Sequence, residues 1–431
     1  MTAEQRPRIL LVTRNLPPLV GGMERLNWHM AEELAKSFEV HAIGPEGSAA
    51  LAPTGVEVCE APLRPLWKFL LHARALARRE AKAWKPDIVL AGSGLTAPIA
   101  RSAARACGAK AAVYVHGLDI AVQHSVYRAV WLPAIRRMDR VIANSRATAD
   151  LCLGIGVAPE RLGIVHPGVD LPSGLEPLST GGRDEGTDMR DVLPRRDANP
   201  DSLPAPSRQP LTEEEVNGRA GFRVRFELGT RPILLSVGRL SVRKGLREFV
   251  AQCLPRIVAA LPDTMLLIVG DVPDDALRAQ AQSPDSIRGA AARAGVESNL
   301  RFLGVITEYD RLGAVYRAAD VHVFPVREIA EDPEGFGMVA VEAAAHGLPT
   351  VAFATGGVVD AVAEGQSGRL VAPGDYAAFA KAVLRTFSER QALRTSCVAF
   401  ARSLAWPEFG VRMAAQMECA ATALPSRCNT A

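Results

Sequence analysis

A glycine and two cations stand close together at the start of the second half of the chain, in the segment 236–245. Gly238 lets the backbone approach a ligand closely, while Arg239 and Lys244 supply positive charge beside it. A diphosphate group needs such partners, and it needs them more strongly when it departs and its negative charge develops. The pattern therefore indicates a diphosphate site, although a solvated basic turn would use the same residue types.

Two glutamates lie in a second segment, which begins as a glycine-containing loop and continues as a helix. Glu334 lies in the loop, and Glu342 lies inside the predicted helix next to Val341 and the alanines 343–345. Carboxylates hydrogen-bond to the vicinal hydroxyls of ribose or hexose, and the N–H groups at a helix N-terminus favour phosphate. A carboxylate in so apolar a stretch needs a partner. We therefore favour a role in ligand binding over a capping carboxylate and a surface glutamate.

Two further candidates lie in the first half. Gly21 and Gly22 stand between a predicted strand and a predicted helix, so their backbone amides are able to face a phosphate, although a flexible loop would also use two glycines. His116 ends a β-rich run. A single histidine more often makes a structural hydrogen bond, so these residues alone do not assign it a function.

The segment 92–97 matches the glycine pattern of a dinucleotide-binding loop and follows a predicted strand. This strand is not the first of its domain, however, and the next strand leads into His116 instead of ending at an acidic residue that would hold a ribose. A nicotinamide-dependent oxidoreductase is therefore an alternative that we do not favour. Hydride transfer observed with added NAD would support this oxidoreductase alternative.

Short apolar runs alternate with helical stretches through both halves. Strands are expected at 8–13, 39–43, 87–91, 111–116 and 140–144, and again at 232–237, 265–270, 300–303, 321–324 and 350–354. Helices are expected at 23–37, 246–261 and 308–318, and in the later part of 334–346. Because this alternation implies parallel sheets, the predicted fold class is α/β, with two Rossmann-like doubly wound domains facing a cleft. Ligands of such sheets bind beyond the carboxyl ends of the strands.

The domain boundaries follow from changes in composition. A chain of 431 residues is too long for one ordinary core. We expect an N-terminal domain at 1–171 and a C-terminal domain at 221–404, with a final helix and tail at 405–431. The segment 172–220 between them is rich in Pro, Gly, Asp, Arg and Ser and has few apolar residues, so it is predicted to be a disordered insertion.

Charge and cysteine content exclude several classes of protein. The 50 basic and 47 acidic residues leave a net charge of +3, which argues against a dedicated nucleic-acid-binding protein. The seven cysteines include no C-x-x-C pair, so neither a zinc site nor a disulfide framework is expected. The sequence contains no signal-type start and no apolar stretch long enough to span a bilayer. A cytoplasmic protein is therefore expected.

One predicted helix, Leu66–Trp84, is amphipathic. Its expected apolar face consists of Leu66, Phe69, Leu70, Ala73, Leu76, Ala77 and Trp84. Its opposite face carries Lys68, Arg74, Arg78, Arg79 and Lys82. The apolar face is expected to pack on the sheet, and the basic face suits an anionic bilayer. This leaves open a peripheral location on the inner face of the cytoplasmic membrane.

Together these motifs resemble the retaining glycosyltransferases of family 4, which have the two-domain glycosyltransferase-B architecture. The resemblance runs from Ile9 to about Phe409, and the insertion after Asp170 is the main departure. It is most specific in the second half, in the stretch SVGRL followed by KG, in RFLG at 301–304 and in EGFGMVAVEAAAHGLPTVA at 334–352. The segments 354–360 and 368–371 also look like the family.

The resemblance implies a role for each matching position. Arg239 and Lys244 would hold the donor diphosphate and stabilise its departure, while Glu334 would contact hydroxyls of the donor sugar. Glu342 would hold the ribose, and His116 would face the donor sugar. The other implied donor-site residues are Gly21, Gly22, Gly238, Gly270, Asp271, Gly304, Val305, Gly335, Phe336, Gly337, Met338 and Val339. The segment 404–417 would form a terminal helix that crosses back onto the first domain.

The resemblance also implies a reaction. A nucleotide-diphosphate sugar would donate a hexosyl group with retention to a lipid-linked or envelope glycan, without a cofactor. No metal is expected either, and the sequence lacks an Asp-x-Asp motif. Retention would proceed by attack on the same face, with the leaving phosphate accepting the proton. Alternatives within the same fold are an epimerase, a phosphorylase, or a nucleotide-sugar-binding protein without transferase activity.

Overall fold

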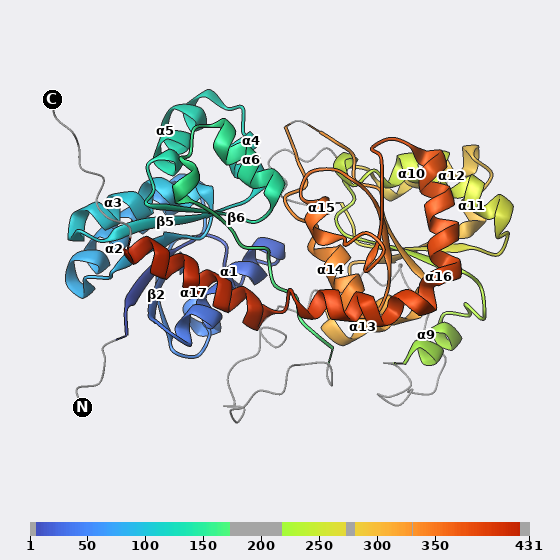
Figure 1. The fold of residues 1–431 in the computed structure, drawn as a ribbon, viewed down its shortest axis with the longest axis horizontal. Coiled ribbons are helices and arrows are strands. Elements are labelled where there is room, and N and C mark those ends of the chain that lie inside the picture. Colours follow the sequence, from blue (N-terminus) through green and yellow to red (C-terminus); the bar gives the residue numbers. More distant parts are fainter. Residues whose placement is uncertain (1–5, 173–217, 273–280, 330, 423–431) are drawn as a thin grey trace. The chain divides into compact units, whose positions relative to one another are not determined.

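The computed structural model describes residues 6–172, 218–272, 281–329 and 331–422, which form two compact α/β units (Figure 1). The first unit includes residues 6–168 and the final helix, α17 (Trp406–Thr422), and the second includes residues 218–405. Val169 belongs to the second unit, because its N–H donates to the Leu404 carbonyl at 2.9 Å and its side chain packs in that unit's core. The first unit therefore ends at Gly168, earlier than the expected 171.

Seven parallel strands form the sheet of the first unit, in the order β3-β2-β1-β4-β5-β6-β7. They are β1 (Arg8–Val12), β2 (Glu39–Pro45), β3 (Val56–Ala61), β4 (Ile88–Ala91), β5 (Lys110–Val115), β6 (Arg140–Ala143) and β7 (Leu162–Ile164). The helices are α1 (Gly22–Ala35), α2 (Leu66–Trp84), α3 (Ala97–Cys107), α4 (Gly117–Ala121), α5 (Ser125–Arg136) and α6 (Arg146–Gly154), with single turns η1 (Ala49–Leu51), η2 (Gly94–Thr96) and η3 (Pro159–Arg161). The central strands are buried, as expected for a sheet covered on both faces.

Six parallel strands form the sheet of the second unit, in the order β10-β9-β8-β11-β12-β13. They are β8 (Ile233–Val237), β9 (Met265–Val269), β10 (Leu300–Gly304), β11 (Val321–Phe324), β12 (Thr350–Phe353) and β13 (Gly368–Val371). The helices are α9 (Arg219–Arg225), α10 (Leu246–Gln252), α11 (Leu254–Ala260), α12 (Pro284–Arg293), α13 (Tyr309–Ala318), α14 (Met338–Ala345), α15 (Val358–Ala361) and α16 (Tyr376–Arg402), with single turns η5 (Val242–Lys244) and η6 (Glu297–Asn299). The expectation of two doubly wound parallel sheets is confirmed.

Two expectations about the elements need correction. The helix expected at 246–261 is two helices, because Pro255 lacks an N–H and therefore starts a new helix at its first turn. Helix α9 begins at Arg219, inside the expected insertion, because Phe222 and Phe226 pack into a core cluster. The rest of that insertion, 173–217, and the tail after Thr422 lie outside the described residues.

Helix α2 has the predicted bounds, but its buried face is narrower than expected. Phe69, Ala73, Ala77 and Ala81 are buried and form a stripe spaced by four residues, which is the repeat of one helical face. Leu66 is exposed, so it does not belong to that face.

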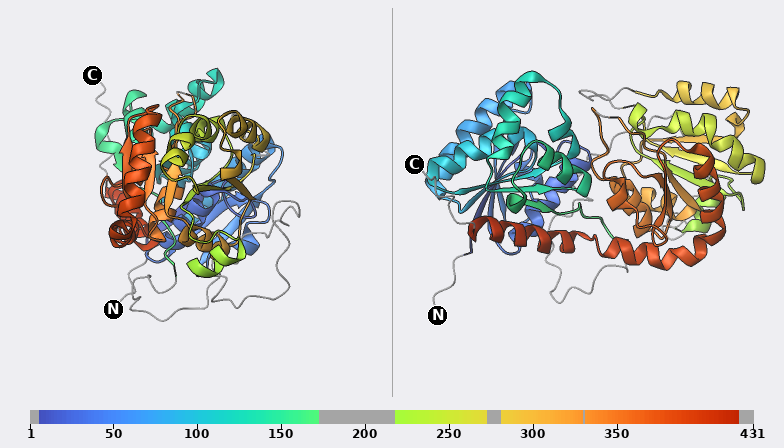
Figure 2. Two further views of the ribbon diagram at one scale, coloured as in Figure 1. Left: turned by 90° about the vertical axis from the view of Figure 1, so that its right-hand side faces the viewer. Right: turned by 45° about the horizontal axis from the view of Figure 1, so that its top comes forward.

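The final helix, α17, packs on the first unit, beside α1 and across β5 and β6 (Figure 2). Trp406 stacks on His29 of α1 at a ring distance of 4.2 Å, and the Gln416 side chain accepts from Arg140 of β6. Gly410 lies against Glu33, where a Cβ atom would overlap the carboxylate. Among the described helices, none is both long and apolar enough to cross a membrane.

The strand order identifies where a ligand site is expected in each unit. It reverses between β1 and β4 in the first sheet and between β8 and β11 in the second. At such a point the loops after the two central strands diverge to opposite faces and leave a crevice at the carboxyl edge. The four loops that follow β1, β4, β8 and β11 are therefore the places to look for a site.

Candidate functional site

Three neighbouring strands of the second unit end at glycines that lie side by side. Gly238, Gly270 and Gly304 follow or end β8, β9 and β10, with φ angles of 135°, 129° and 68°. The Gly270 N–H donates to the Gly304 carbonyl at 2.8 Å, and a Cβ atom on Gly270 would overlap the Gly238 carbonyl. Only glycine accommodates these backbone conformations without strain. At this edge of the sheet the glycine backbone is therefore not covered by side chains of its own. The next residues, Asp271 and Val305, are exposed.

A carboxylate and two cations meet where the strand order of the second sheet reverses. Lys244, in the turn after β8, places its Nζ atom 2.8 Å from Oε2 of Glu334, in the loop after β11. Arg243 donates through Nη1 to the same Glu334 oxygen, and its Nε lies 3.2 Å from Oδ2 of Asp332. The Lys244 ammonium also lies over the Phe324 ring, 4.5 Å from its centroid. The structure thus joins two of the expected residues, Lys244 and Glu334.

Arg239 lies near this cluster but does not join it. Its side chain is exposed and has no hydrogen bond or ion pair with any described residue, although its charge acts on Glu334. An exposed guanidinium that no carboxylate neutralises is able to bind an incoming anion. Arg239 is therefore an unpaired cation of the described part of this site, whereas Lys244 is held by Glu334.

The charges in the cluster set the protonation of Glu334 and Lys244. Burial alone would raise the pKa of Glu334, but Lys244 and Arg243, with a smaller contribution from Arg239, hold that pKa below its ordinary value. Burial lowers the pKa of Lys244, Glu334 only partly opposes this effect, and the positive charges of Arg243 and Arg239 lower the pKa further. Glu334 is therefore ionised at neutral pH.

The loop that carries Glu334 is fixed through its backbone. The Gly357 N–H donates to the Glu334 carbonyl at 2.8 Å, and a Cβ atom on Gly356 would lie 2.6 Å from that same oxygen. Gly337 has φ 98° and directly precedes α14. Gly335 and the buried Phe336 therefore lead into a helix start at which Met338 and Val339 stand, in the arrangement that presents N–H groups to an anion.

Glu342 has a partner, as its apolar surroundings required. It lies on α14, one turn beyond the helix start, and its Oε2 accepts a hydrogen bond from the Tyr316 hydroxyl of α13 at 3.0 Å. Tyr316 is itself stacked on His346, with the ring centroids 5.2 Å apart. This contact orients the carboxylate while leaving it half-buried rather than enclosed.

The glycines expected in the first unit lie at the carboxyl edge of its sheet. Gly21 is the residue before α1 and Gly22 is the first residue of that helix, and both are exposed. Glu24 in the first helical turn accepts from the Asn15 side chain at 2.7 Å, which ties the helix start to the loop after β1. The N–H groups at the start of α1 therefore face solvent.

His116 lies at the carboxyl end of β5, directly before α4. Burial lowers the pKa of its imidazole, and the charges of Asp119 and Glu24 only partly oppose this, so the ring is neutral at neutral pH. Its Nε2 atom finds no hydrogen-bond partner within the part of the chain that the structure describes. Its backbone N–H donates to Asp119 at 3.0 Å, which fixes its position.

The structure gives the dinucleotide-like glycines of 92–97 a packing role. A Cβ atom on Gly92 would overlap Asn27, and one on Gly94 would lie 2.7 Å from Asp119. The Gly94 N–H also donates to that Asp119 carboxylate at 3.0 Å. Because side chains of the protein itself occupy the space beside these glycines, their presence is explained without a pyrophosphate.

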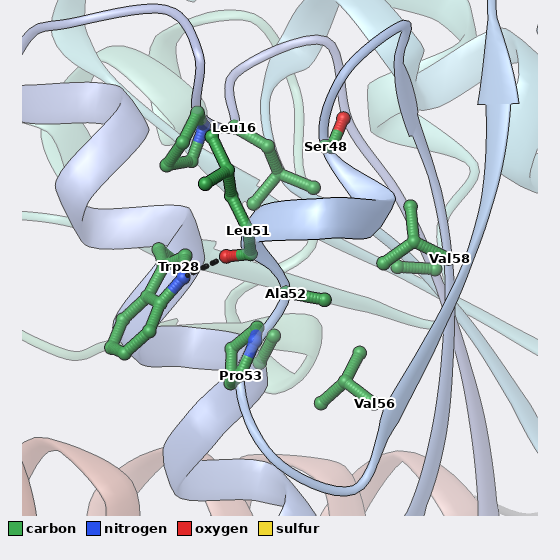
Figure 3. Close-up of a pocket in the computed structure, with 11 residues that line it drawn as sticks. Leu16, Trp28, Ser48, Leu51, Ala52, Pro53, Val56 and Val58 are labelled. Carbon is green, nitrogen blue, oxygen red and sulfur yellow. Dashed lines mark hydrogen bonds between the residues drawn. The ribbon is translucent and has the colours of Figure 1, made fainter. Parts of the chain in front are cut away.

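An apolar hollow in the first unit lies between α1, η1 and the strands β2 and β3 (Figure 3). No ionisable side chain lines it. Trp28 closes one side and donates through Nε1 to the Leu51 carbonyl at 2.8 Å. This hollow offers no charge to a phosphate and contains none of the expected site residues.

Sequence reasoning missed three residues of the site. Arg243 and Asp332 belong to the charge cluster, and Tyr316 holds Glu342. The sequence does offer a signal for two of them. Arg243 directly precedes Lys244 and is a further cation of that segment, and Asp332 precedes Glu334 in the same loop. Tyr316 carries no local signal, because it comes from a different helix and meets Glu342 only after folding.

Family models match both halves of the chain. Residues 20–172 match the model described as "Glycosyltransferase Family 4", and residues 231–389 match the one described as "Glycosyl transferases group 1". A GDP-mannose-dependent α-(1-6)-phosphatidylinositol monomannoside mannosyltransferase of Mycolicibacterium smegmatis is 28% identical over 87% of this chain and 88% of its own length. A D-inositol 3-phosphate glycosyltransferase of Streptomyces coelicolor is 31% identical over 58% of this chain and 48% of its own length, so the chain spans about half of that relative.

A solved structure supports the architecture. Anabaena HepE in complex with UDP superimposes with a TM-score of 0.67 at 19% identity, covering 96% of this chain and 99% of that one. The same protein has also been solved with UDP-glucose. A likeness at this identity establishes the fold, and the two family models cover most of both units. The chain belongs to the family 4, group 1 glycosyltransferases with the glycosyltransferase-B fold.

Proposed function

We propose that this protein transfers a hexosyl group from a nucleotide-diphosphate sugar to a lipid-linked or envelope glycan, with retention of configuration. The observation that carries the proposal is the meeting of Lys244 and Glu334 where the second sheet reverses, beside the glycine edge and the start of α14. The mannosyltransferase relative uses GDP-mannose, and HepE was solved with UDP and UDP-glucose, so both kinds of donor are tested below.

The geometry suits a diphosphate leaving group. Arg239 and Lys244 supply positive charge, and the N–H groups at the start of α14 supply oriented dipoles. Glu334 accepts hydrogen bonds from donor-sugar hydroxyls, and Glu342 accepts them from the ribose. The neutral imidazole of His116 is suited to a sugar hydroxyl, because its ring nitrogens can donate one hydrogen bond and accept another.

In the proposed step the bond between the sugar C1 and the diphosphate oxygen breaks. The acceptor hydroxyl oxygen forms its bond to C1 on the same face, and its proton passes to the leaving phosphate oxygen. Arg239 and Lys244 stabilise the charge that develops, which is the task a divalent cation performs in other transferases. The reaction therefore needs neither a metal nor a further cofactor.

A transfer assay tests this function directly. The purified protein is incubated with UDP-glucose or GDP-mannose and with D-inositol 3-phosphate or phosphatidylinositol monomannoside, and released nucleoside diphosphate is measured. We expect release with one donor, unchanged by EDTA, and an NMR coupling constant that shows retention in the product. Transfer to D-inositol 3-phosphate but not to phosphatidylinositol monomannoside would contradict the acceptor class, because D-inositol 3-phosphate is neither lipid-linked nor a glycan. Absence of any consumption would favour a silent sugar-nucleotide-binding protein, and epimerised donor would favour the epimerase.

We also propose that α2 contacts an anionic membrane surface. Its outward face carries Trp67 and Leu71, which are 58% and 59% exposed, together with the exposed Arg74 and Arg78. Lys68 lies over the Trp67 ring at 5.6 Å. Large apolar groups flanked by cations suit the boundary between headgroups and acyl chains, and the cations complement anionic lipid. Such a contact would place the protein on the inner face of the cytoplasmic membrane.

Vesicle sedimentation checks this contact. We expect binding to vesicles containing phosphatidylglycerol, weakened by salt, and little binding to pure phosphatidylcholine. The double variant Trp67→Ser, Leu71→Ser should bind about tenfold more weakly, because two large apolar side chains no longer enter the bilayer. The matched control is Leu153→Ser on α6, which is 43% exposed and lies on another helix. Equal loss in the control, or no loss in the double variant, would contradict the proposal.

A further inference from the structure

Arg243 holds the carboxylates of one loop by two contacts. It donates to the Glu334 carboxylate through Nη1, and its Nε forms an ion pair with Asp332 at 3.2 Å. The side chain is buried, with 10% of its surface exposed. Its backbone carbonyl also accepts from the Arg327 N–H at 2.8 Å, and a Cβ atom on Gly245 would overlap the Pro325 carbonyl. The turn after β8 is therefore fastened to the loop after β11 by both backbone and side chain.

Glu334 and a donor diphosphate would compete for the ammonium group of Lys244. Lys244 Nζ lies 2.8 Å from Oε2 of Glu334, whose side chain is only 11% exposed. When a diphosphate takes Lys244, the carboxylate loses a direct partner in a place where water reaches it poorly. An ionised carboxylate left in that state is costly, and this cost would be subtracted from the affinity for the donor.

We infer that Arg243 is a positioning residue that keeps Glu334 neutralised while Lys244 moves from Glu334 to the donor diphosphate. The inference rests on the proposed donor site and deepens it. Arg243 contacts neither donor nor acceptor. It acts through Glu334, which it holds in place to receive the sugar hydroxyls, and Asp332 fixes the guanidinium from its other side.

This role differs from that of a third cation that binds the diphosphate itself. A direct contact would strengthen diphosphate binding whatever residue stands at position 334. A positioning residue matters only while position 334 carries a charge that needs a partner. A double-mutant cycle between Arg243 and Glu334 therefore separates the two roles.

Calorimetric titration of the full-length protein with UDP, GDP, ADP and dTDP provides the measurement. We expect Arg243→Gln to weaken binding by about 10- to 100-fold, because Glu334 is then left without a direct partner when Lys244 is engaged. In a Glu334→Gln background the same Arg243→Gln change should alter binding by less than about threefold. Arg247→Gln is the matched control, since Arg247 is more exposed and pairs with Glu248.

Kd measurements at a series of pH values test the inference further, because a purely structural role of Arg243 would not give the pH dependence expected here. Arg243 is one of the charges that lower the pKa of Glu334, so its removal raises that pKa. As the pH falls from neutrality, Glu334 of the Arg243→Gln variant becomes protonated first and no longer needs a partner. The ratio of the variant's Kd to that of the parent protein should therefore shrink toward one at acid pH.

Three results would overturn the inference. An equal loss from Arg243→Gln in both backgrounds would make Arg243 a direct ligand of the diphosphate. Parent-like binding by Arg243→Gln would show that Arg243 has no role in donor binding. If the glutamine variant does not fold, Arg243→Lys, which keeps the charge, is measured in its place. If the parent protein binds none of these nucleoside diphosphates, the proposed function fails and the inference fails with it.

Discussion

Lys244→Gln is expected to lower kcat by about 100- to 1000-fold, because the leaving diphosphate then loses a buried cation at the moment its charge develops. Lys244 is the partly buried cation in the turn after β8, and its ammonium lies over the Phe324 ring, close to where the donor diphosphate is proposed to bind. Steady-state kinetics with the active donor measure the loss. An effect confined to the transition state appears in kcat, whereas an effect on donor binding alone would appear in KM.

The matched control for this variant is Lys381→Gln, which makes the same change at an exposed position of α16 in the same unit. It should leave kcat unchanged. If Lys244→Gln retained kcat within about threefold of the parent, the cation at this position would not stabilise the leaving group. Arg239, the exposed guanidinium, would then become the leading candidate for that task.

Glu334→Gln is expected to reduce both activity and stability. It removes the negative charge that Arg243 and Lys244 share, leaving two partly buried cations beside each other. We expect a loss of about 1–3 kcal/mol in the free energy of unfolding and at least a 100-fold loss in kcat/KM. Chemical denaturation and steady-state kinetics measure the two effects.

A second experiment separates these two consequences of the Glu334 change. Saturating nucleoside diphosphate should restore much of the lost stability, because its negative charge replaces that of Glu334 among the cations. Glu297→Gln on η6 is the control, since Glu297 is exposed in the same unit. Parent-like stability of the Glu334→Gln variant would show that the cluster does not depend on this carboxylate.

The sequence predicted the fold well because both sheets are built from short buried strands with strong apolar patterns. It missed β3 and β7 in the first sheet and β13 in the second, where several residues are only partly buried and the apolar runs are weak. It also joined α10 and α11, although Pro255 marked the break. In each case the local pattern was weaker than the tertiary packing that decided the structure.

The candidate site was predictable in its residue types but not in its pairing. Lys244 and Glu334 were expected to act on one donor, and the structure places them in contact. Arg243, and not Arg239, joins them, because the single turn η5 brings Arg243 and Lys244 to the same Glu334 oxygen, whereas Arg239 precedes that turn and is exposed. Tyr316 could not be assigned to Glu342 because no spacing along the chain relates two separate helices.

The sequence also did not predict which apolar residues of α2 are exposed. Helical periodicity placed Leu66 on the apolar face, but the packed stripe begins at Phe69 and leaves Leu66 and Trp67 in solvent. Which apolar residues of an amphipathic helix are buried depends on the extent of the layer beneath them. That extent is a property of the whole unit and is not encoded in the helix itself.

The central claim is that the second unit holds a sugar-nucleotide donor, and a thermal-shift series tests it most directly. The protein and its Glu342→Ala variant are melted with UDP-, GDP-, ADP- and dTDP-sugars and with NAD(P). A ligand that binds only the folded protein raises its Tm. We predict that one class of sugar nucleotide raises the Tm of the parent protein and not that of the variant. A rise with NAD(P) alone would contradict the claim and return the glycines at 92–97 to consideration as a binding site.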